Sequence, residues 1–282
     1  MTEIIELFKR ALAFLMAIIA SIGGLITGDS TVVEGDIELV SEYAYSLDDG
    51  LAFGQGITTD GEYFYGIGAL KVASFCAVTK IDAKTGKIIK TNGYCVPEEL
   101  MKDGYSHFGD GDYYNGKLYI ACEDFGFRYP AIFVYDAETL EYLEYHEVPQ
   151  GVLSDNHIPW CVVDNDIIYI SEFDNVSEIK MLKLSDYSYI GSIKLDKTLN
   201  SVQGGDIYNG VLYLSSDDGD KEKPTYAIDL ATGHVTTAFV RGTGNVNTEA
   251  EGLAVYPMEN GSIFHITDAG TSIKIRSYSY SK

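Results

Sequence analysis

The chain repeats one short phrase five times, and this repeat constrains its fold more than any other feature. Each phrase combines a tight turn, most often Asn-Gly or Asp-Gly, with an aliphatic-aromatic run, as in YYNGKLYIAC and IYNGVLYLSS. Successive phrases are separated by 55, 50, 44 and 51 residues, counted between their turn residues Asp60, Asn115, Asn165, Asn209 and Asn260. Internal repeats of this length are typical of propellers and related arrays.

A second phrase follows each of the first four, as in KIDAKTGKII and AIDLATGHVT. The distance between the two turns is nearly constant, at 22, 21, 20 and 20 residues, whereas the distance between units varies. Two hairpin turns in each unit give four short antiparallel strands in roughly 50 residues, the size of a propeller blade. We predict an all-β, five-bladed β-propeller with four-stranded blades. A single sandwich, the alternative, would not explain the constant inner distance.

The two ends of the chain predict how the ring closes. After the fifth phrase only SIKIRSYSY remains, which is enough for one or two strands, so the last blade lacks an outer strand. The stretch GDIELVSEYAYS, at residues 35–46, alternates apolar and polar residues and precedes the first blade. We expect this N-terminal strand to complete the last blade, because an unpaired sheet edge is a liability.

The first 30 residues form a separate segment. Lys9 and Arg10 precede an uncharged apolar stretch of 18 residues, 11–28. This length is short for a membrane span and slightly long for a secretory core, and the preceding cations predict that the body is exported. We expect residues 1–30 to be a signal peptide or membrane anchor. Residues 31–282 would then form the propeller, either secreted or anchored outside the membrane. A buried helix of the domain is the alternative.

Charge restricts the partners of the protein. With 42 Asp and Glu against 20 Lys and Arg, the formal net charge is −22. An acidic surface repels nucleic acid and anionic lipid. We therefore expect no nucleic-acid partner and membrane contact only through the N-terminal segment. We also expect a monomer.

The cysteines leave two alternatives open. Cys76, Cys95, Cys122 and Cys161 contain no CxxC pair, so a zinc site is not indicated. An exported chain permits disulfides. Free buried thiols and one Cys76–Cys95 bridge therefore both remain open.

The loops that enter the innermost strands of a propeller meet at one end of its axis. Here these loops are LAFGQG, SHFGDG, NHIPWC, NSVQGG and TEAEGL. We expect them to surround a peptide or small-molecule ligand, with Trp160 as a wall. Structural roles, such as a turn-forming Asp110 or histidines that bond between blades, are the alternatives. The polar residues of these loops are Gln55, His107, Asp110, Asn156, His157, Asn200, Gln203, Glu249 and Glu251.

The same loops resemble a known family over most of residues 37–270. AFGQG at 52–56 and HFGDG at 107–111 are similar to phrases of the plant and bacterial glutamine cyclotransferases. The resemblance implies a five-bladed propeller that converts the N-terminal Gln of a peptide to pyroglutamate and releases ammonia. It further implies that Gln55 contacts the substrate, that Asp110 stands where the family has a catalytic Glu, and that Asn200 is an active-site residue.

In such a reaction one carboxylate can carry a proton from the attacking amine to the leaving ammonia, while a neighbouring amide holds the tetrahedral oxygen. The resemblance implies a type of cyclotransferase that needs no metal. We predict that Asp110 and Glu251 are catalytic, with no metal or other cofactor. The predicted substrate-binding residues are Gln55, His107, His157, Trp160, Asn200 and Gln203. Two other functions remain open. One is a non-catalytic binding propeller. The other is a lactonase-like or esterase-like hydrolase that uses a divalent cation such as calcium, held by His107, His157, Asp110, Glu249 and Glu251.

Overall fold

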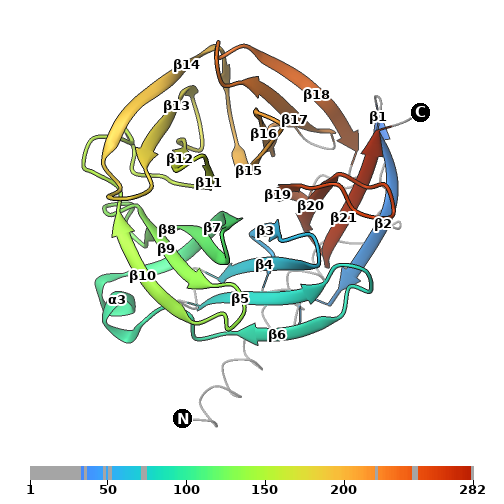
Figure 1. The fold of residues 1–282 in the computed structure, drawn as a ribbon, viewed down its shortest axis with the longest axis horizontal. Helices are drawn as coiled ribbons and strands as arrows, with labels where there is room; N and C mark the ends of the chain where they lie inside the picture. Colours follow the sequence, from blue (N-terminus) through green and yellow to red (C-terminus); the bar gives the residue numbers. More distant parts are fainter. Residues whose placement is uncertain are drawn as a thin grey trace.

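Five antiparallel sheets stand around a common axis and form a closed ring (Figure 1). The computed structural model describes residues 33–34, 37–46, 49, 53–70, 75–219, 222–242 and 247–280. The all-β, five-bladed prediction is confirmed. The predicted signal peptide or anchor at residues 1–30 lies outside the described residues. Within the described part, no helix has both the length and the apolar character that crossing a bilayer requires.

In blades 1 to 4 the four main strands follow chain order from the axis to the rim, and in blade 5 the three inner strands do. Blades 1 and 2 contain β3 (Gly56–Thr59), β4 (Tyr63–Leu70), β5 (Phe75–Asp82), β6 (Ile88–Asn92), then β7 (Tyr105–Tyr114), β8 (Lys117–Asp124), β9 (Ala131–Asp136) and β10 (Tyr142–Glu147). Blade 3 contains β11 (Cys161–Asp164), β12 (Ile167–Ile170), β13 (Val176–Lys183) and β14 (Tyr189–Leu199). Blades 4 and 5 contain β15 (Val202–Tyr208), β16 (Val211–Ser216), β17 (Glu222–Asp229), β18 (Val235–Gly242), then β19 (Glu249–Val255), β20 (Phe264–Ala269) and β21 (Ile273–Tyr280). The short helix α3 (Glu98–Asp103) joins blades 1 and 2.

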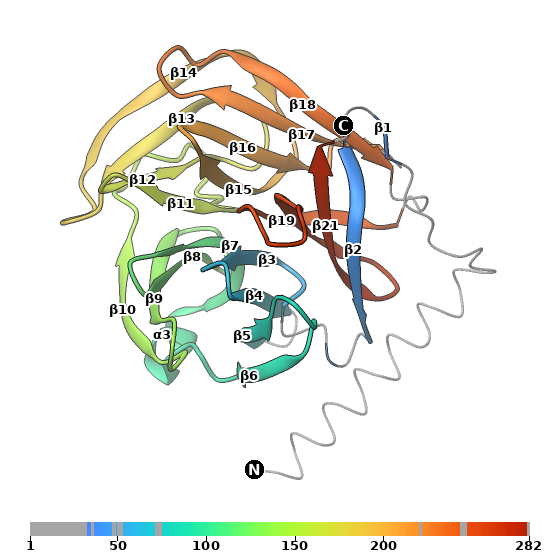
Figure 2. The ribbon, with the colours of Figure 1, turned by 45° about the vertical axis from the view of Figure 1, so that its right-hand side comes forward.

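The ring closes as predicted. Strand β2 (Ile37–Tyr45) lies antiparallel to β21 and supplies the outer strand of blade 5 (Figure 2). A buried ion network reinforces this closure, since Asp268 accepts from Arg241 of blade 4 and from Arg276, whose Nε also donates to Glu42 of β2 at 2.8 Å. A two-residue strand, β1 (Val33–Glu34), pairs with the outer edge of blade 4. The sequence did not predict this strand, because two residues are too few to show an alternation of apolar and polar side chains.

The hairpin turns explain the repeated phrase. Asn115, Asn165 and Asn209 have φ values of 51°, 48° and 53°, and the residue after each also has a positive φ. Two successive positive φ values define the type I′ turn, whose twist matches that of the strands it joins. At Asp60 and Asn260 the side-chain oxygen instead accepts the backbone N–H two residues later, at 2.9 and 3.0 Å. Both solutions favour Asn or Asp, which is why the repeat is visible in the sequence.

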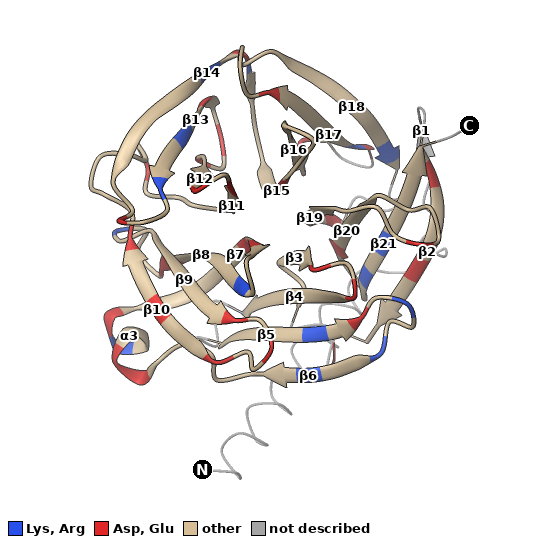
Figure 3. Cartoon of the chain, in the orientation of Figure 1, with Lys and Arg blue, Asp and Glu red and all other residues tan. Residues whose placement is uncertain are grey.

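The core consists of five apolar layers, one between each pair of neighbouring blades. Aromatic side chains hold these layers together, as where Tyr65 of blade 1 stacks on Tyr113 of blade 2 with ring centres 5.8 Å apart. Acidic residues occur on all parts of the ring (Figure 3). The apolar side chains thus lie between the blades.

All four cysteines are buried and free, so the Cys76–Cys95 bridge does not form. We expect a thiol reagent to count four thiols after unfolding in denaturant without reductant, and almost none in the native protein. The melting temperature should be the same with and without reductant, because no bond is there to be reduced. A count of two thiols in the unfolded, unreduced protein would contradict this assignment.

Candidate functional site

The backbones of the innermost strands pack directly against one another at the hub. A Cβ atom added to Gly252 would lie 2.5 Å from the Cα of Gly56, and one added to Gly204 would lie 2.7 Å from the Cα of Gly252. A Cβ at Gly109 would lie 2.1 Å from the carbonyl oxygen of Pro159. Only glycine permits such approaches. The glycines of the predicted loops therefore bring the five backbones together around the axis.

Asp110 joins its own blade 2 to the four other blades. Its Oδ1 accepts from the N–H of Ile57 at 2.8 Å, and its Oδ2 accepts from Gly205 at 3.1 Å and Leu253 at 3.0 Å. Its own N–H donates to the oxygen of Pro159 at 2.7 Å. The residue is 0% exposed. Burial raises the pKa of Asp110 to about 8, against the opposing effect of the backbone donors. These contacts give Asp110 a structural role at the hub.

Irregularities in the innermost strands direct these side chains inward. The ladder of β7 with β8 shifts between Phe108 and Gly111, and that of β19 with β20 shifts between Ala250 and Leu253. A β-bulge of this kind turns a side chain away from its regular direction. Asp110 and Glu251 both lie in such bulges, so the backbone places each of them near the axis.

Five side chains form a line across blades 5, 1, 2 and 3, joined by three hydrogen bonds and one close histidine–carboxylate contact. We call this line the polar row. Glu251 Oε1 accepts from Gln55 Nε2 at 3.1 Å, and Gln55 Oε1 lies 3.1 Å from His107 Nε2. His107 Nδ1 lies 2.9 Å from Glu123 Oε2, and Glu123 Oε1 lies 3.3 Å from His157 Nε2. Each member contacts the next, in the order acid, amide, imidazole, acid and imidazole.

The structure adds Glu123 to the site, which sequence reasoning missed. This residue is 1% exposed, lies opposite His107 in the β7–β8 ladder, and also accepts the N–H of Ile158 at 2.6 Å. One signal could have identified it: a carboxylate directly after the apolar run YIAC is buried and so needs partners. It holds both predicted histidines in place.

The buried carboxyl of Glu251 forms one end of the row. It is 3% exposed, and burial raises its pKa well above the usual range. The neighbouring carboxyl of Glu249, which is exposed, raises it further through a hydrogen bond and charge repulsion. Glu251 thus retains its proton to a higher pH than an ordinary glutamate, which suits a group that must both take up and return a proton.

The structure places other predicted residues away from the row. Trp160 is 0% exposed and packs in the layer between blades 3 and 4, where its Nε1 donates to Ser171 at 3.0 Å. It is therefore not the predicted wall of a ligand site. Asn200 accepts the N–H of Asn175 at 3.0 Å and joins two loops, while Gln203 is half-buried at the start of β15. Of the predicted binding residues, the structure brings together Gln55, His107 and His157.

The described residues contain no group of three His, Cys, Asp or Glu side chains arranged to hold a metal ion. The carboxylates and imidazoles of the row instead contact one another or the Gln55 amide. The geometry thus offers no support for the set of calcium ligands considered from the sequence.

The fold is similar to those of solved enzyme structures. No protein-family model and no curated protein sequence matches the chain. The glutaminyl cyclase of Myxococcus xanthus superimposes with a TM-score of 0.61 and 12% identity, over 87% of this chain and 97% of that one. An exo-beta-1,3-galactanase from Phanerochaete chrysosporium gives a TM-score of 0.56 and 13% identity, over 86% of this chain and 64% of that one. At such identities the similarity shows the fold alone.

Proposed function

We propose that this protein is a glutaminyl-peptide cyclotransferase, which converts the N-terminal Gln of a peptide to pyroglutamate and releases ammonia. The observation that carries the proposal is the polar row, where Glu251, an acid with a raised pKa, accepts from the Gln55 amide, and this amide in turn contacts the His107 imidazole. The shared fold with the Myxococcus xanthus glutaminyl cyclase supports it. The similarity of the AFGQG and HFGDG loops to those of the cyclotransferases points to the same chemistry.

The reaction forms one bond and breaks another within the substrate. The α-amine nitrogen attacks the carbonyl carbon of the glutamine side chain, and the bond from this carbon to the amide nitrogen then breaks. The amine loses a proton and the leaving nitrogen gains one, so ammonia departs neutral. One carboxyl group placed between the two nitrogens can carry this proton. We assign this part to Glu251.

Gln55 and His107 would orient the substrate beside Glu251. Both side chains are partly exposed, whereas Glu251 is buried and contacts Gln55. An N–H of either residue can donate to the oxygen that becomes negative during attack, an interaction that contributes about 3 kcal/mol per donor in other enzymes. Glu123 fixes the His107 ring from the opposite side. Asp110, predicted to be catalytic, receives the structural role instead because three backbone donors occupy its carboxylate.

The test is ammonia release from a peptide that begins with Gln. The full chain is incubated with this peptide and with a control peptide of the same sequence whose amine is acetylated. We expect ammonia and a pyroglutamyl product from the first peptide only, because the acetylated nitrogen cannot attack. Absence of ammonia from mildly acidic to mildly basic pH would rule the proposal out.

A non-catalytic peptide-binding propeller is the second candidate. It is favoured by the low exposure of Glu251, which limits access of a substrate to that carboxyl. Calorimetric binding of the Gln peptide without ammonia release would establish it. A hydrolase that binds calcium would melt at a higher temperature with calcium than with chelator, because a ligand of the native state raises the melting temperature. We expect the same melting temperature in both conditions.

We also propose that residues 1–30 direct export and leave the propeller outside the cell, as a monomer. The support is the order of charges in this segment, two cations followed by 18 uncharged residues. If the propeller is anchored, protease treatment of intact cells should degrade or release it. If the propeller is secreted, it should appear in the medium.

A further inference from the structure

Three aromatic residues stand on one loop beside the polar row. The loop at residues 125–130 joins β8 to β9, and Phe125 is 64% and Tyr129 47% exposed. Phe127 is half-buried between them. A polar exterior normally leaves few large apolar side chains together, so such a group indicates a binding surface.

Asp124 holds this loop in one conformation. Its buried carboxylate accepts from the backbone N–H groups of Gly126, Arg128 and Tyr129, at 3.0, 2.5 and 2.8 Å, and from Arg128 Nε at 2.8 Å. Phe127 has a φ of 51°, a left-handed conformation that is strained for a bulky side chain. Backbone strain of this kind is often retained at binding sites. The fixed loop loses little conformational freedom when a ligand binds.

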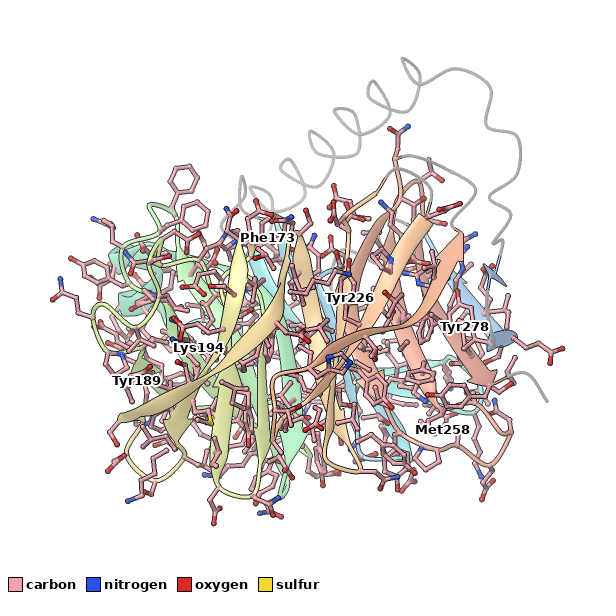
Figure 4. All side chains as sticks on the ribbon, turned by 90° about the horizontal axis from the view of Figure 1, so that it is seen from above. Phe173, Tyr189, Lys194, Tyr226, Met258 and Tyr278 are labelled. Atoms are coloured by element: carbon pink, nitrogen blue, oxygen red, sulfur yellow. The ribbon has the colours of Figure 1, made fainter. Side chains whose placement is uncertain are left out.

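The loop is continuous with the polar row through His157. The ring centre of His157 lies 5.0 Å from that of Phe127 and 5.0 Å from that of Phe173, while its Nε2 contacts Glu123. Figure 4 views the ring from its edge and shows Phe173 toward one face and Met258 toward the opposite face. Phe127 and Phe173 therefore lie beside His157, where the row ends. We call Phe125, Phe127 and Tyr129 of this loop, together with Phe173, the aromatic shelf.

We propose that the aromatic shelf binds the side chains of the residues that follow the N-terminal Gln, and so selects peptides with aromatic or large apolar residues there. This inference rests on the proposed function. A peptide whose first residue lies at Glu251 and Gln55 can extend along the row over His107 and His157 to the shelf. The net charge of −22 repels acidic peptides, so the preferred substrate is apolar or basic beyond its first residue.

The experiment compares peptides that differ only in their second and third residues, Phe against Ala, with wild-type full chain and with the double variant Phe125→Ala and Tyr129→Ala. Two aromatic contacts predict a preference of about tenfold in kcat/KM for the Phe peptide. The double variant should lose most of this preference, because its kcat/KM for the Phe peptide should fall toward that for the Ala peptide. Phe173→Ala, tested separately, should weaken the preference too.

Tyr189→Ala is the matched control, because Tyr189 is 45% exposed but lies on β14 at the rim, as Figure 4 shows. It should leave the preference unchanged. An equal preference in the wild type and the double variant would overturn the inference, as would displacement of a bound Phe peptide by beta-1,3-galactotriose from the shelf. That result would mark a glycan site.

Peptide binding is measured as well as turnover, so that failure of the cyclotransferase proposal can be distinguished from failure of the aromatic-shelf proposal. Calorimetry uses the Glu251→Gln variant, which should not turn the peptides over. Turnover without a Phe preference retains the cyclotransferase and removes the shelf. A Phe preference in binding without turnover by wild type removes the cyclotransferase and leaves the shelf as a peptide-binding surface.

Discussion

Replacement of Asp110 by Ala should lower the free energy of unfolding by about 4 kcal/mol, because three buried backbone N–H groups lose their acceptor. These groups belong to Ile57, Gly205 and Leu253, on blades 1, 4 and 5. For a domain of this size, the loss corresponds to a fall of roughly 10 °C in the melting temperature. Thermal unfolding followed by circular dichroism, at one pH for both proteins, measures it.

Asp229→Ala provides the control for this experiment. Asp229 also accepts two backbone N–H groups, those of Ala231 and Thr232, but it lies in an exposed turn. Water can replace an exposed acceptor, so we expect a loss of about 1 kcal/mol or less. Equal losses at positions 110 and 229 would show that Asp110 does not hold the blades together at the hub.

Replacement of Glu251 by Gln should lower kcat/KM for a Gln peptide by about 100-fold to 10,000-fold, the usual contribution of a general acid–base group. Gln has nearly the same shape as Glu but cannot carry a proton. The fold should persist, because Gln removes a buried acid whose ionisation is unfavourable and still offers an oxygen to the Gln55 amide. Steady-state rates and a melting curve on the same sample separate loss of chemistry from loss of structure.

Glu259→Gln makes the same chemical change in the exposed turn between β19 and β20. Its activity should equal that of the wild type. If Glu251→Gln also retained full activity while folded, the proton transfer would have to be assigned to another group.

The pH profile tests the same assignment. Glu251 must be ionised to accept the proton of the amine, so activity should rise as pH increases through its raised pKa. The Glu249 carboxyl contributes to that rise in pKa. Glu249→Gln removes this negative charge and lowers the pKa of Glu251, so the acidic limb of the profile should move to lower pH. An unchanged limb would mean that Glu251 does not control it.

The sequence predicted the ring because the same turn chemistry recurs at Asn115, Asn165 and Asn209 with a constant distance to the second turn. It also predicted the closing strand β2, whose alternation is visible in IELVSEYAY. Gln55, His107, His157 and Glu251 were correctly expected to meet, since the loops that enter the innermost strands must converge. These predictions depend on periodicity and topology, which a sequence records directly.

The remaining features depend on the direction in which each side chain points, which the spacing of residues along the sequence does not encode. Asp110 between two glycines was equally consistent with chemistry and with structure, until the backbones of three other blades were found at its carboxylate. Trp160 lies where a strand begins, and a shift of one residue decides whether a side chain there points to the axis or into the core. Glu123 lies on a second strand, outside the loops on which the prediction focused.

The most direct measurement is the mass spectrum of a Gln peptide after incubation with wild-type protein and, in parallel, with folded Glu251→Gln. Our account predicts that the wild type converts the peptide to its pyroglutamyl form, with the loss of one ammonia, and that the variant leaves it intact. Equal conversion by both proteins, or an unchanged peptide in both, would contradict it.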